Sequence, residues 1–338
     1  MKTLVCTRPG IFEYHDAPEP VGKEDYSLIR IKRIGICGTD LHAFEGTQPF
    51  FSYPRILGHE LAGELIEPNG AIGFNKGETV TIVPYFYCGQ CIACRLGKPN
   101  CCVQIQVCGV HCNGGMAEYL SVPSYSLVHG EGLSLNELAL IEPLAIGAHG
   151  VERAGIKTGE HVLVVGAGPI GLCTMLFAKL EGANVMAMDR SEERLSFCRT
   201  VLGIQHTVNA SSSGVTEKLS ELTNGDMHTV VIDATGNLTA INNGFQFIAH
   251  GGRYVLIGLQ KEHVTFSHPE FHKREATLMS SRNATRKDFD KVIAAIKDKK
   301  VNPSAFITHQ VLFDQVKERF ADWIDPRNGV IKAMVTME

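Results

Sequence analysis

The chain has 338 residues, of which 44% are hydrophobic and 20% are charged, and this composition is typical of a globular protein with about two domains. The formal net charge of −4, from 32 basic and 36 acidic residues, provides no electrostatic footprint for nucleic acid or an anionic membrane. The longest apolar run, residues 162–178, is interrupted by glycines and a proline. It therefore predicts a strand, a turn and a helix rather than a membrane span.

The N-terminal residues lack the apolar core of a signal peptide and predict a first strand. Eleven cysteines without a secretion signal indicate metal ligands and free thiols in a reducing compartment rather than disulfides. We therefore expect a cytoplasmic protein.

The first part of the chain, up to about residue 145, predicts short strands separated by turns. Residues 28–34 alternate apolar and polar side chains, residues 78–83 form a second β-type segment, and Gly and Pro punctuate the intervals. We expect a β-rich domain here.

Three residues of this part have side chains that suit a catalytic zinc: Cys37, His59 and Glu60. Sulfur, imidazole and carboxylate ligands with one open position define such a site. A single Cys or His is also commonly packed or solvated, so the spacing alone leaves both interpretations open.

A cluster of four cysteines follows at the spacing C-x2-C-x2-C-x7-C, within a lobe of about residues 86–104. Short loops at this spacing can bring four thiolates to the corners of a tetrahedron, which is the arrangement of a closed structural zinc site. The ligands would be Cys88, Cys91, Cys94 and Cys102. Cys101 is an alternative to Cys102 as the fourth ligand. The alternative to a zinc site is a loop with four reduced cysteines that bind no metal.

The sequence pattern changes near Gly159. Predicted strands at 162–165, 185–188, 230–233 and 254–258 alternate with amphipathic helices, which favours a parallel, doubly wound sheet. A helix at 287–299 and a strand at 331–335 are expected to close the chain.

A glycine-rich turn follows the first of these strands and opens a helix. Its glycines permit a tight turn and a close approach to a pyrophosphate, and the helix N-terminus offers free N–H groups. We assign cofactor binding to Gly166, Gly168, Pro169, Ile170 and Gly171.

Asp189 ends the next predicted strand, where a carboxylate binds a ribose diol and repels a 2′-phosphate. NAD is therefore favoured over NADP. We also assign cofactor binding to Arg190 and Arg194. The Arg190 side chain could lie over the adenine or bind a phosphate. A helix-capping role is the alternative for Asp189.

These motifs occur in one order over nearly the whole chain, and Glu142-Pro143 stands between them. The chain resembles the zinc-dependent medium-chain dehydrogenases of the alcohol and polyol dehydrogenase superfamily. The resemblance implies a GroES-like catalytic domain of residues 1–146 and 285–338 and a Rossmann NAD-binding domain of residues 147–284. It also implies two zinc ions per subunit, return of the C-terminal segment to the catalytic domain, and a homodimer or homotetramer.

Glu142 stands where simple alcohol dehydrogenases place a cysteine ligand, and Glu-Pro at this point resembles the sorbitol and threonine dehydrogenase branch. The resemblance implies that Cys37, His59 and one or both of Glu60 and Glu142 hold the catalytic zinc, directly or through water. From residue types alone, Glu142 is also a normal N-terminal carboxylate of a helix that begins before Pro143.

Thr39 and His42 resemble the proton-relay residues of the family, and we assign them catalytic roles. A helix cap at Thr39 and a solvated His42 are the alternatives. Asp40 is interpreted as a cap or as a residue that supports the ligands. His111 and Cys112 are interpreted as structural.

Residues 48–54, 268–273 and 281–285 resemble bacterial sugar-acid dehydrogenases of the L-galactonate 5-dehydrogenase and starvation-sensing-protein type. A guanidinium at Arg282 could pair with a sugar-acid carboxylate, and a salt bridge is its alternative role. Phe51, with Phe50, is assigned to the rim of the substrate pocket, with core packing as the alternative.

The resemblance implies NAD-dependent oxidation of a secondary hydroxyl of a small-molecule sugar acid, such as L-galactonate or L-gulonate, to a ketone. A polyol such as sorbitol or galactitol, L-threonine and a simple secondary alcohol are alternative substrates. A non-catalytic NAD-binding regulator is the alternative of another class.

Overall fold

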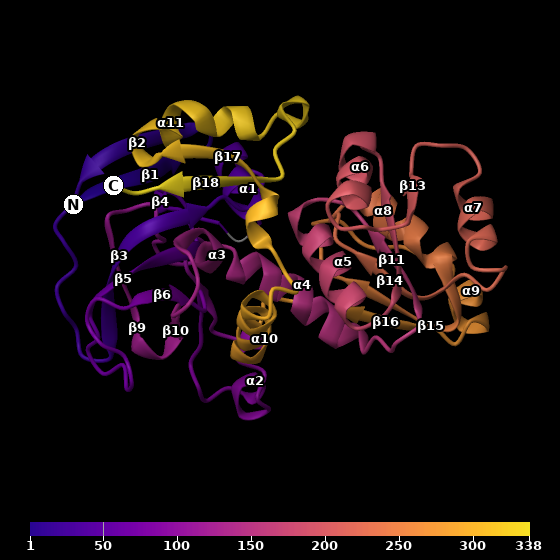
Figure 1. Ribbon diagram of the computed structural model, residues 1–338, viewed down its shortest axis with the longest axis horizontal. Coiled ribbons are helices and arrows are strands. Elements are labelled where there is room, and N and C mark those ends of the chain that lie inside the picture. Colours follow the sequence, from indigo (N-terminus) through magenta and orange to yellow (C-terminus); the bar gives the residue numbers. More distant parts are fainter. Residues whose placement is uncertain (50) are drawn as a thin grey trace. The chain divides into compact units, whose positions relative to one another are not determined.

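The computed structural model describes residues 1–49 and 51–338, which divide into two compact units (Figure 1). Unit 1 comprises Met1–Glu142 and Thr285–Glu338, and unit 2 comprises Pro143–Ala284. The division falls within helix α4 (Ile141–Ala154), which begins in unit 1. The predicted class, a β-rich domain with a doubly wound parallel-sheet domain, is confirmed.

The main sheet of unit 1 is built around β3 (Tyr26–Gly35). This strand pairs antiparallel with β5 (Glu60–Glu67), β9 (Tyr119–Pro123) and β18 (Lys332–Thr336). The sheet extends from β5 through β6 (Thr79–Ile82) to β10 (Leu127–His129), and from β18 to β17 (Ile307–Leu312). The last strand of the chain thus lies beside an early strand, so that long-range pairing brings residues 26–35 and 332–336 together.

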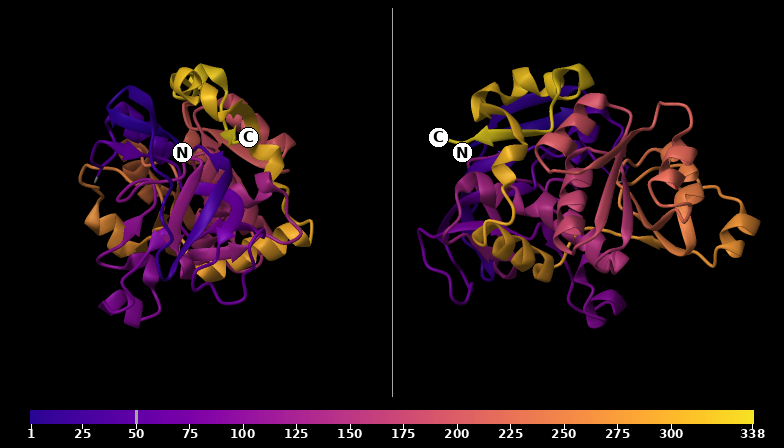
Figure 2. Two further views of the ribbon diagram at one scale, coloured as in Figure 1. Left: turned by 90° about the vertical axis from the view of Figure 1, so that its left-hand side faces the viewer. Right: turned by 45° about the vertical axis from the view of Figure 1, so that its right-hand side comes forward.

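A second sheet joins β1 (Lys2–Arg8), β2 (Ile11–Asp16) and β4 (Arg55–Ile56). Figures 1 and 2 show the yellow C-terminal segment, with α11 (Val316–Arg319), beside these indigo strands. The contact is aromatic, since the Phe12 and Phe320 ring centroids are 4.8 Å apart with the rings edge to face. Burial of such rings is a strong apolar contribution to the core.

Unit 2 contains a parallel sheet with the strand order β13-β12-β11-β14-β15-β16. The order reverses between β11 and β14, as it does in dinucleotide-binding folds, where the ligand lies beyond the carboxyl ends of the strands at the reversal. The strands are β11 (His161–Val165), β12 (Asn184–Asp189), β13 (His206–Asn209), β14 (His228–Asp233), β15 (Ile248–Leu256) and β16 (Thr277–Ser280).

The strands of this sheet are largely apolar because helices pack against them. Leu163, Met186, Val231 and Tyr254 are members of one buried core cluster. Strand β15 (Ile248–Leu256) starts earlier than the predicted strand 254–258 and ends two residues before it. Its pairing with β14 shifts register between Ile248 and Arg253, where Gly251 has φ of +74°.

Besides the greater part of α4, unit 2 contains the helices α5 (Pro169–Leu180), α6 (Glu192–Thr200), α7 (Val215–Glu221), α8 (Leu238–Gly244) and α9 (His268–Lys273). Unit 1 also contains α1 (Gly38–Glu45), α2 (Ile92–Arg95), α3 (Leu135–Ala139), α10 (Arg286–Lys297) and the short strands β7 (Tyr85–Phe86) and β8 (Gln106–Val107). In the described part of the chain, every helix is too short or too polar to cross a membrane.

The glycine turn between β11 and α5 leaves no room for a side chain at Gly171. A Cβ placed on Gly171 would lie 1.8 Å from the Gly166 carbonyl oxygen, whereas at Gly168 the nearest atom is Arg194 Nη1 at 3.8 Å. We predict that Gly171→Ala lowers the free energy of unfolding by about 1–3 kcal/mol, as overpacking does. The matched variant Gly168→Ala should unfold within about 0.5 kcal/mol of the parent. Urea unfolding without cofactor measures both, and equal effects would contradict the steric argument.

Candidate active site

The predicted ligands Cys37, His59 and Glu60 come together in unit 1. Cys37 caps the N-terminus of α1, His59 precedes β5, and Glu60 begins it. One ligand atom from each lies within 4.8 Å of the others. His59 is 4% exposed and Glu60 is fully buried, whereas Cys37 is partly exposed.

Asp40 joins the two segments that carry these side chains. Its carboxylate accepts a hydrogen bond from the Cys37 backbone N–H at 2.9 Å and another from the Gly58 N–H at 3.1 Å. Its Oδ1 lies 3.9 Å from His59 Nδ1. Burial raises the pKa of Asp40, although His59 and the backbone N–H of Cys37 oppose this. Asp40 thus closes a capping box at the start of α1 and also ties this segment to the one before His59, so its contacts fit both of its expected roles.

Lys332 from the C-terminal strand β18 neutralises Glu60. Its Nζ donates to the two carboxylate oxygens of Glu60 at 2.6 and 2.8 Å and to the Ile36 carbonyl at 3.0 Å. Lys332 is only 3% exposed. This residue was not predicted from the sequence, although a single lysine within the apolar run 331–335 is a signal of a buried cation.

Glu142 lies in the first turn of α4 and is also buried. The Tyr85 hydroxyl, from β7, donates a hydrogen bond to Glu142 Oε1. Burial raises the pKa of Glu142, and burial together with the Glu142 charge raises the pKa of Tyr85 well above its usual range. Glu142 interacts electrostatically with His59 but is not among the three residues whose ligand atoms gather within 4.8 Å. Tyr85 was also missed from the sequence.

The electrostatics of the cluster fit a cation. Burial alone would lower the pKa of His59, but the surrounding Cys37, Asp40 and Glu142 outweigh it and raise that pKa well above its usual value. His59 Nδ1 is buried and makes no hydrogen bond to the described residues. Sulfur, nitrogen and carboxylate oxygen form a donor set that zinc accepts, so these residues suit a zinc ion.

The two predicted relay residues lie on α1. Thr39 is half-buried in its first turn, and His42 is exposed, with Nδ1 3.3 Å from Thr47 Oγ1 and 3.4 Å from Glu45 Oε2. Phe51 is half-buried, packs against the core of unit 1 and contacts the Tyr53 ring at 4.8 Å, which fits its alternative role in packing. Phe50 lies outside the described residues.

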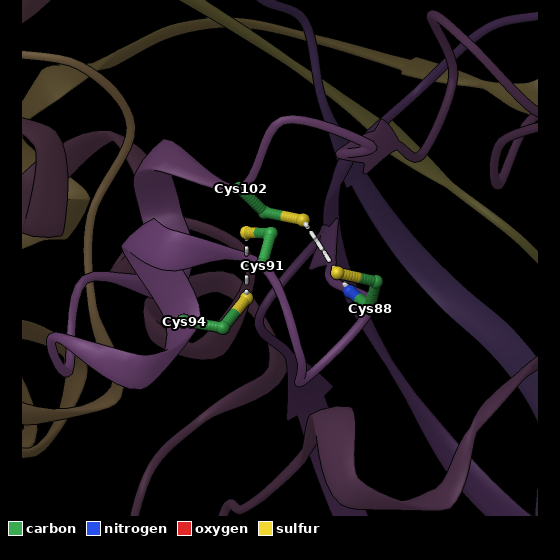
Figure 3. A group of neighbouring side chains, drawn as sticks. All are labelled: Cys88, Cys91, Cys94 and Cys102. Carbon is green, nitrogen blue, oxygen red and sulfur yellow. Dashed lines mark hydrogen bonds between the residues drawn. The ribbon is translucent and has the colours of Figure 1, made fainter.

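The four-cysteine cluster forms as one group in unit 1 (Figure 3). The sulfur atoms of Cys88, Cys91, Cys94 and Cys102 lie within 4.8 Å of one another, and the Cys91–Cys94 and Cys88–Cys102 pairs are 3.5 Å apart. Backbone N–H groups of Cys94 and Val103 lower the pKa of Cys91 to about 6, which favours its thiolate. Cys101 is exposed and is not part of the group.

The predicted cofactor-binding residues gather at the start of α5 in unit 2. Gly166 has φ of +98°, Gly168 caps α5, and Pro169, Ile170 and Gly171 form its first turn. At the end of β12, Asp189 accepts hydrogen bonds from the Ala167 N–H at 2.6 Å and the Ser191 N–H at 2.8 Å.

The three predicted arginines also belong to unit 2. Arg194 is half-buried beside Gly168, whereas Arg190 is exposed directly after β12. Arg282 is exposed in the segment that follows β16.

Comparison with known proteins places this arrangement in a family. Residues 23–131 match the alcohol dehydrogenase GroES-like domain, and residues 169–298 match the zinc-binding dehydrogenase domain. The chain is 43% identical to L-galactonate-5-dehydrogenase of Escherichia coli, over 99% of each chain. It belongs to the zinc-binding dehydrogenase family. The resemblance predicted from the sequence motifs is thus confirmed.

Other relatives of this zinc-binding dehydrogenase agree in activity class and fold. It is 32% identical to sorbitol dehydrogenase of Halalkalibacterium halodurans, over 92% of each chain. An Escherichia coli alcohol dehydrogenase complexed with NADH has a TM-score of 0.93 at 28% identity, covering 99% of both chains. A dehydrogenase of Sinorhizobium meliloti bound to NADP has a TM-score of 0.91 at 27% identity, covering 99% of this chain and 98% of the other.

The geometry of the cysteine cluster predicts which neighbouring cysteine holds metal. We expect two zinc ions per chain, one at each cluster, and Cys102→Ser should reduce this content to about one because one of four tetrahedral ligands is lost. Cys101→Ser, the neighbouring control, should retain both ions. Elemental analysis measures the content, and equal zinc loss in the two variants would contradict the assignment.

The Glu60–Lys332 pair predicts a large stability effect. Lys332→Met leaves Glu60 buried without its ammonium partner, so we expect the free energy of unfolding to fall by about 3–5 kcal/mol. Lys2→Met is the matched control, since Lys2 makes an equally short 2.6 Å ion pair with Asp314 at an exposed site. It should cost at most about 1 kcal/mol. Urea unfolding compares the two, and a similar loss in both would show that burial is not the cause.

Proposed function

We propose that this dehydrogenase oxidises a secondary hydroxyl of a sugar acid to a ketone, with NAD as the hydride acceptor. The observation that supports this most directly is the 43% identity to L-galactonate-5-dehydrogenase over 99% of both chains. The buried cluster of Cys37, His59 and Glu60 supplies the chemistry that such a reaction needs.

A catalytic zinc would be held by Cys37, His59 and one or both of Glu60 and Glu142. When bound, such an ion acts as a Lewis acid that polarises an alcohol oxygen and makes its proton easier to remove. Asp40 holds the Cys37 and His59 segments together, and Lys332 and Tyr85 orient the two carboxylates. The chain thus fixes the ligands before substrate binds, and this limits the reorganisation that the reaction requires.

Proton transfer is assigned to α1. Thr39 Oγ1 accepts the proton of the substrate hydroxyl and passes its own proton on, and the exposed imidazole of His42 delivers a proton to solvent. His42 suits this last role because it lies on the surface.

A second, structural zinc would be held by Cys88, Cys91, Cys94 and Cys102. Four sulfur ligands leave no open position, so this ion would stabilise the lobe and take no part in catalysis.

NAD is favoured over NADP by Asp189. Two backbone N–H groups fix its carboxylate at the end of β12, beside the glycine turn. A fixed negative charge at this position binds a ribose diol and repels a 2′-phosphate. The Gly166–Gly171 turn and the N-terminus of α5 would receive the pyrophosphate, with Arg194 beside Gly168.

Substrate selection tests the proposal. The purified dehydrogenase should form NADH with L-galactonate or L-gulonate, and a zinc chelator should abolish the reaction. Galactitol, sorbitol, L-threonine and propan-2-ol complete the panel. Turnover of a neutral polyol alone would favour a polyol dehydrogenase, the alternative suggested by the sorbitol dehydrogenase relative. Turnover of L-threonine alone would favour a threonine dehydrogenase. No turnover with NAD still binding would favour the regulator.

The role proposed for Arg282 is contact with the substrate carboxylate. Arg282→Ala should raise KM for the sugar acid by about tenfold or more, because a charge-assisted hydrogen bond contributes about 1.5–3 kcal/mol. Any turnover of a neutral polyol should be unchanged. Arg282→Lys keeps the charge but loses the planar guanidinium, so its KM for the sugar acid should lie between those of the parent and Arg282→Ala. Steady-state kinetics measures these values, and an unchanged KM for the acid in Arg282→Ala would remove the residue from the site.

A further inference from the structure

Two cysteines outside both metal clusters lie together on a tight turn in unit 1. The turn follows β8 and is closed by a hydrogen bond of 2.8 Å from the His111 N–H to the Val107 carbonyl. Cys108 and Cys112 are paired across it by an isolated β-bridge. Bridged residues have Cα atoms about 5 Å apart, within the range of about 4.4–6.8 Å that a disulfide spans.

The two side chains are close enough that a hydrogen-bonding interaction between them shifts the pKa of each thiol. This bond, helped by the charge of Arg55, lowers the pKa of Cys112 and favours its thiolate. The same bond, together with burial, raises the pKa of Cys108 well above its usual value. Arg55 Nε is buried and makes no hydrogen bond among the described residues.

The two sulfur atoms differ in access to solvent. Cys112 is partly exposed and lines a surface pocket of ≈ 400 Å³ together with Phe86, Gln106 and Asn113. Cys108 is fully buried, with Sγ 3.6 Å from the Asn113 carbonyl oxygen. An accessible thiolate next to a buried thiol is the arrangement of an attacking and a resolving cysteine.

We propose that Cys112 and Cys108 form a redox-active pair that is oxidised by hydroperoxides. The Cys112 thiolate attacks one peroxide oxygen, the O–O bond breaks, and the leaving oxygen takes up a proton to give water or an alcohol. The sulfur of Cys108 then attacks the sulfur of the Cys112 sulfenic acid. The S–O bond breaks, hydroxide leaves with the Cys108 proton as water, and an S–S bond forms. Two thiols lose two electrons, and the peroxide gains them.

This role replaces the purely structural interpretation of Cys112. The sequence interval C-x3-C is too short to show whether the two side chains face each other, because that depends on the turn. Arg55, which favours the thiolate, lies far away in the sequence and reaches the turn through the fold.

The test uses the purified full-length dehydrogenase with its zinc. Hydrogen peroxide is added to the folded protein, remaining thiols are alkylated under denaturing conditions, and the digest is sequenced by mass spectrometry. The peptide with Cys108 and Cys112 should carry no alkyl group at either position and weigh about 2 Da less than the dithiol. Dithiothreitol should restore alkylation.

Single variants separate the two roles. Cys108→Ser should stop oxidation at a Cys112 sulfenic acid, which dimedone traps, because no resolving thiol remains. Cys112→Ser should reduce peroxide-induced loss of alkylation at Cys108 by at least about tenfold. The control Cys101→Ser removes an exposed cysteine outside the pair and should leave the Cys108–Cys112 link unchanged.

Two results would overturn the proposal. One is full alkylation of both Cys108 and Cys112 in the peroxide-treated parent. The other is a link that forms equally in protein unfolded before peroxide is added, since the folded turn and Arg55 would then play no part.

Discussion

Negative charge buried in unit 1 is the constraint around which the candidate site is arranged. Asp40, Glu60 and Glu142 are all nearly inaccessible to solvent and surround His59. An unpaired buried carboxylate costs several kcal/mol, so each requires a donor or a cation. Backbone N–H groups donate hydrogen bonds to Asp40, the Lys332 ammonium group donates to Glu60, and the Tyr85 hydroxyl donates to Glu142. The remaining negative charge around His59 and Cys37 makes the cluster a good receptor for a cation.

The same constraint links the site to the course of the chain. Lys332 is 272 residues from Glu60 in sequence, and it reaches Glu60 because β18 pairs with β3, which in turn pairs with β5. The pairing of the C-terminal strand β18 with β3 therefore extends the main sheet and places the Lys332 ammonium group beside Glu60. The aromatic contact between Phe12 and Phe320 adds apolar burial to the same connection. The geometry of the candidate site and the stability of the fold therefore depend on shared residues.

Local motifs were predicted well because their geometry is set by a few neighbouring residues. The sulfur atoms of Cys88, Cys91, Cys94 and Cys102 converge as their spacing suggested, and Cys101, the alternative, is exposed and not part of the group. The strand, turn and helix around Gly166 and Gly171 form as expected, because the glycines permit a backbone that other residues would clash with. By contrast, Phe51 contributes to packing in unit 1, which residue type alone could not decide.

The sequence by itself determined the strand–helix alternation, the glycine turn before α5, the cysteine lobe and the family to which the chain belongs. Each of these follows from backbone preferences and ligand spacing within short stretches. Only the tertiary structure decided that Lys332 neutralises Glu60, that Tyr85 holds Glu142 and that the charge of Arg55 lowers the pKa of Cys112. Those partners meet through strand pairing and burial between distant segments, and the energetic need to compensate a buried charge does not specify which distant residue will do so.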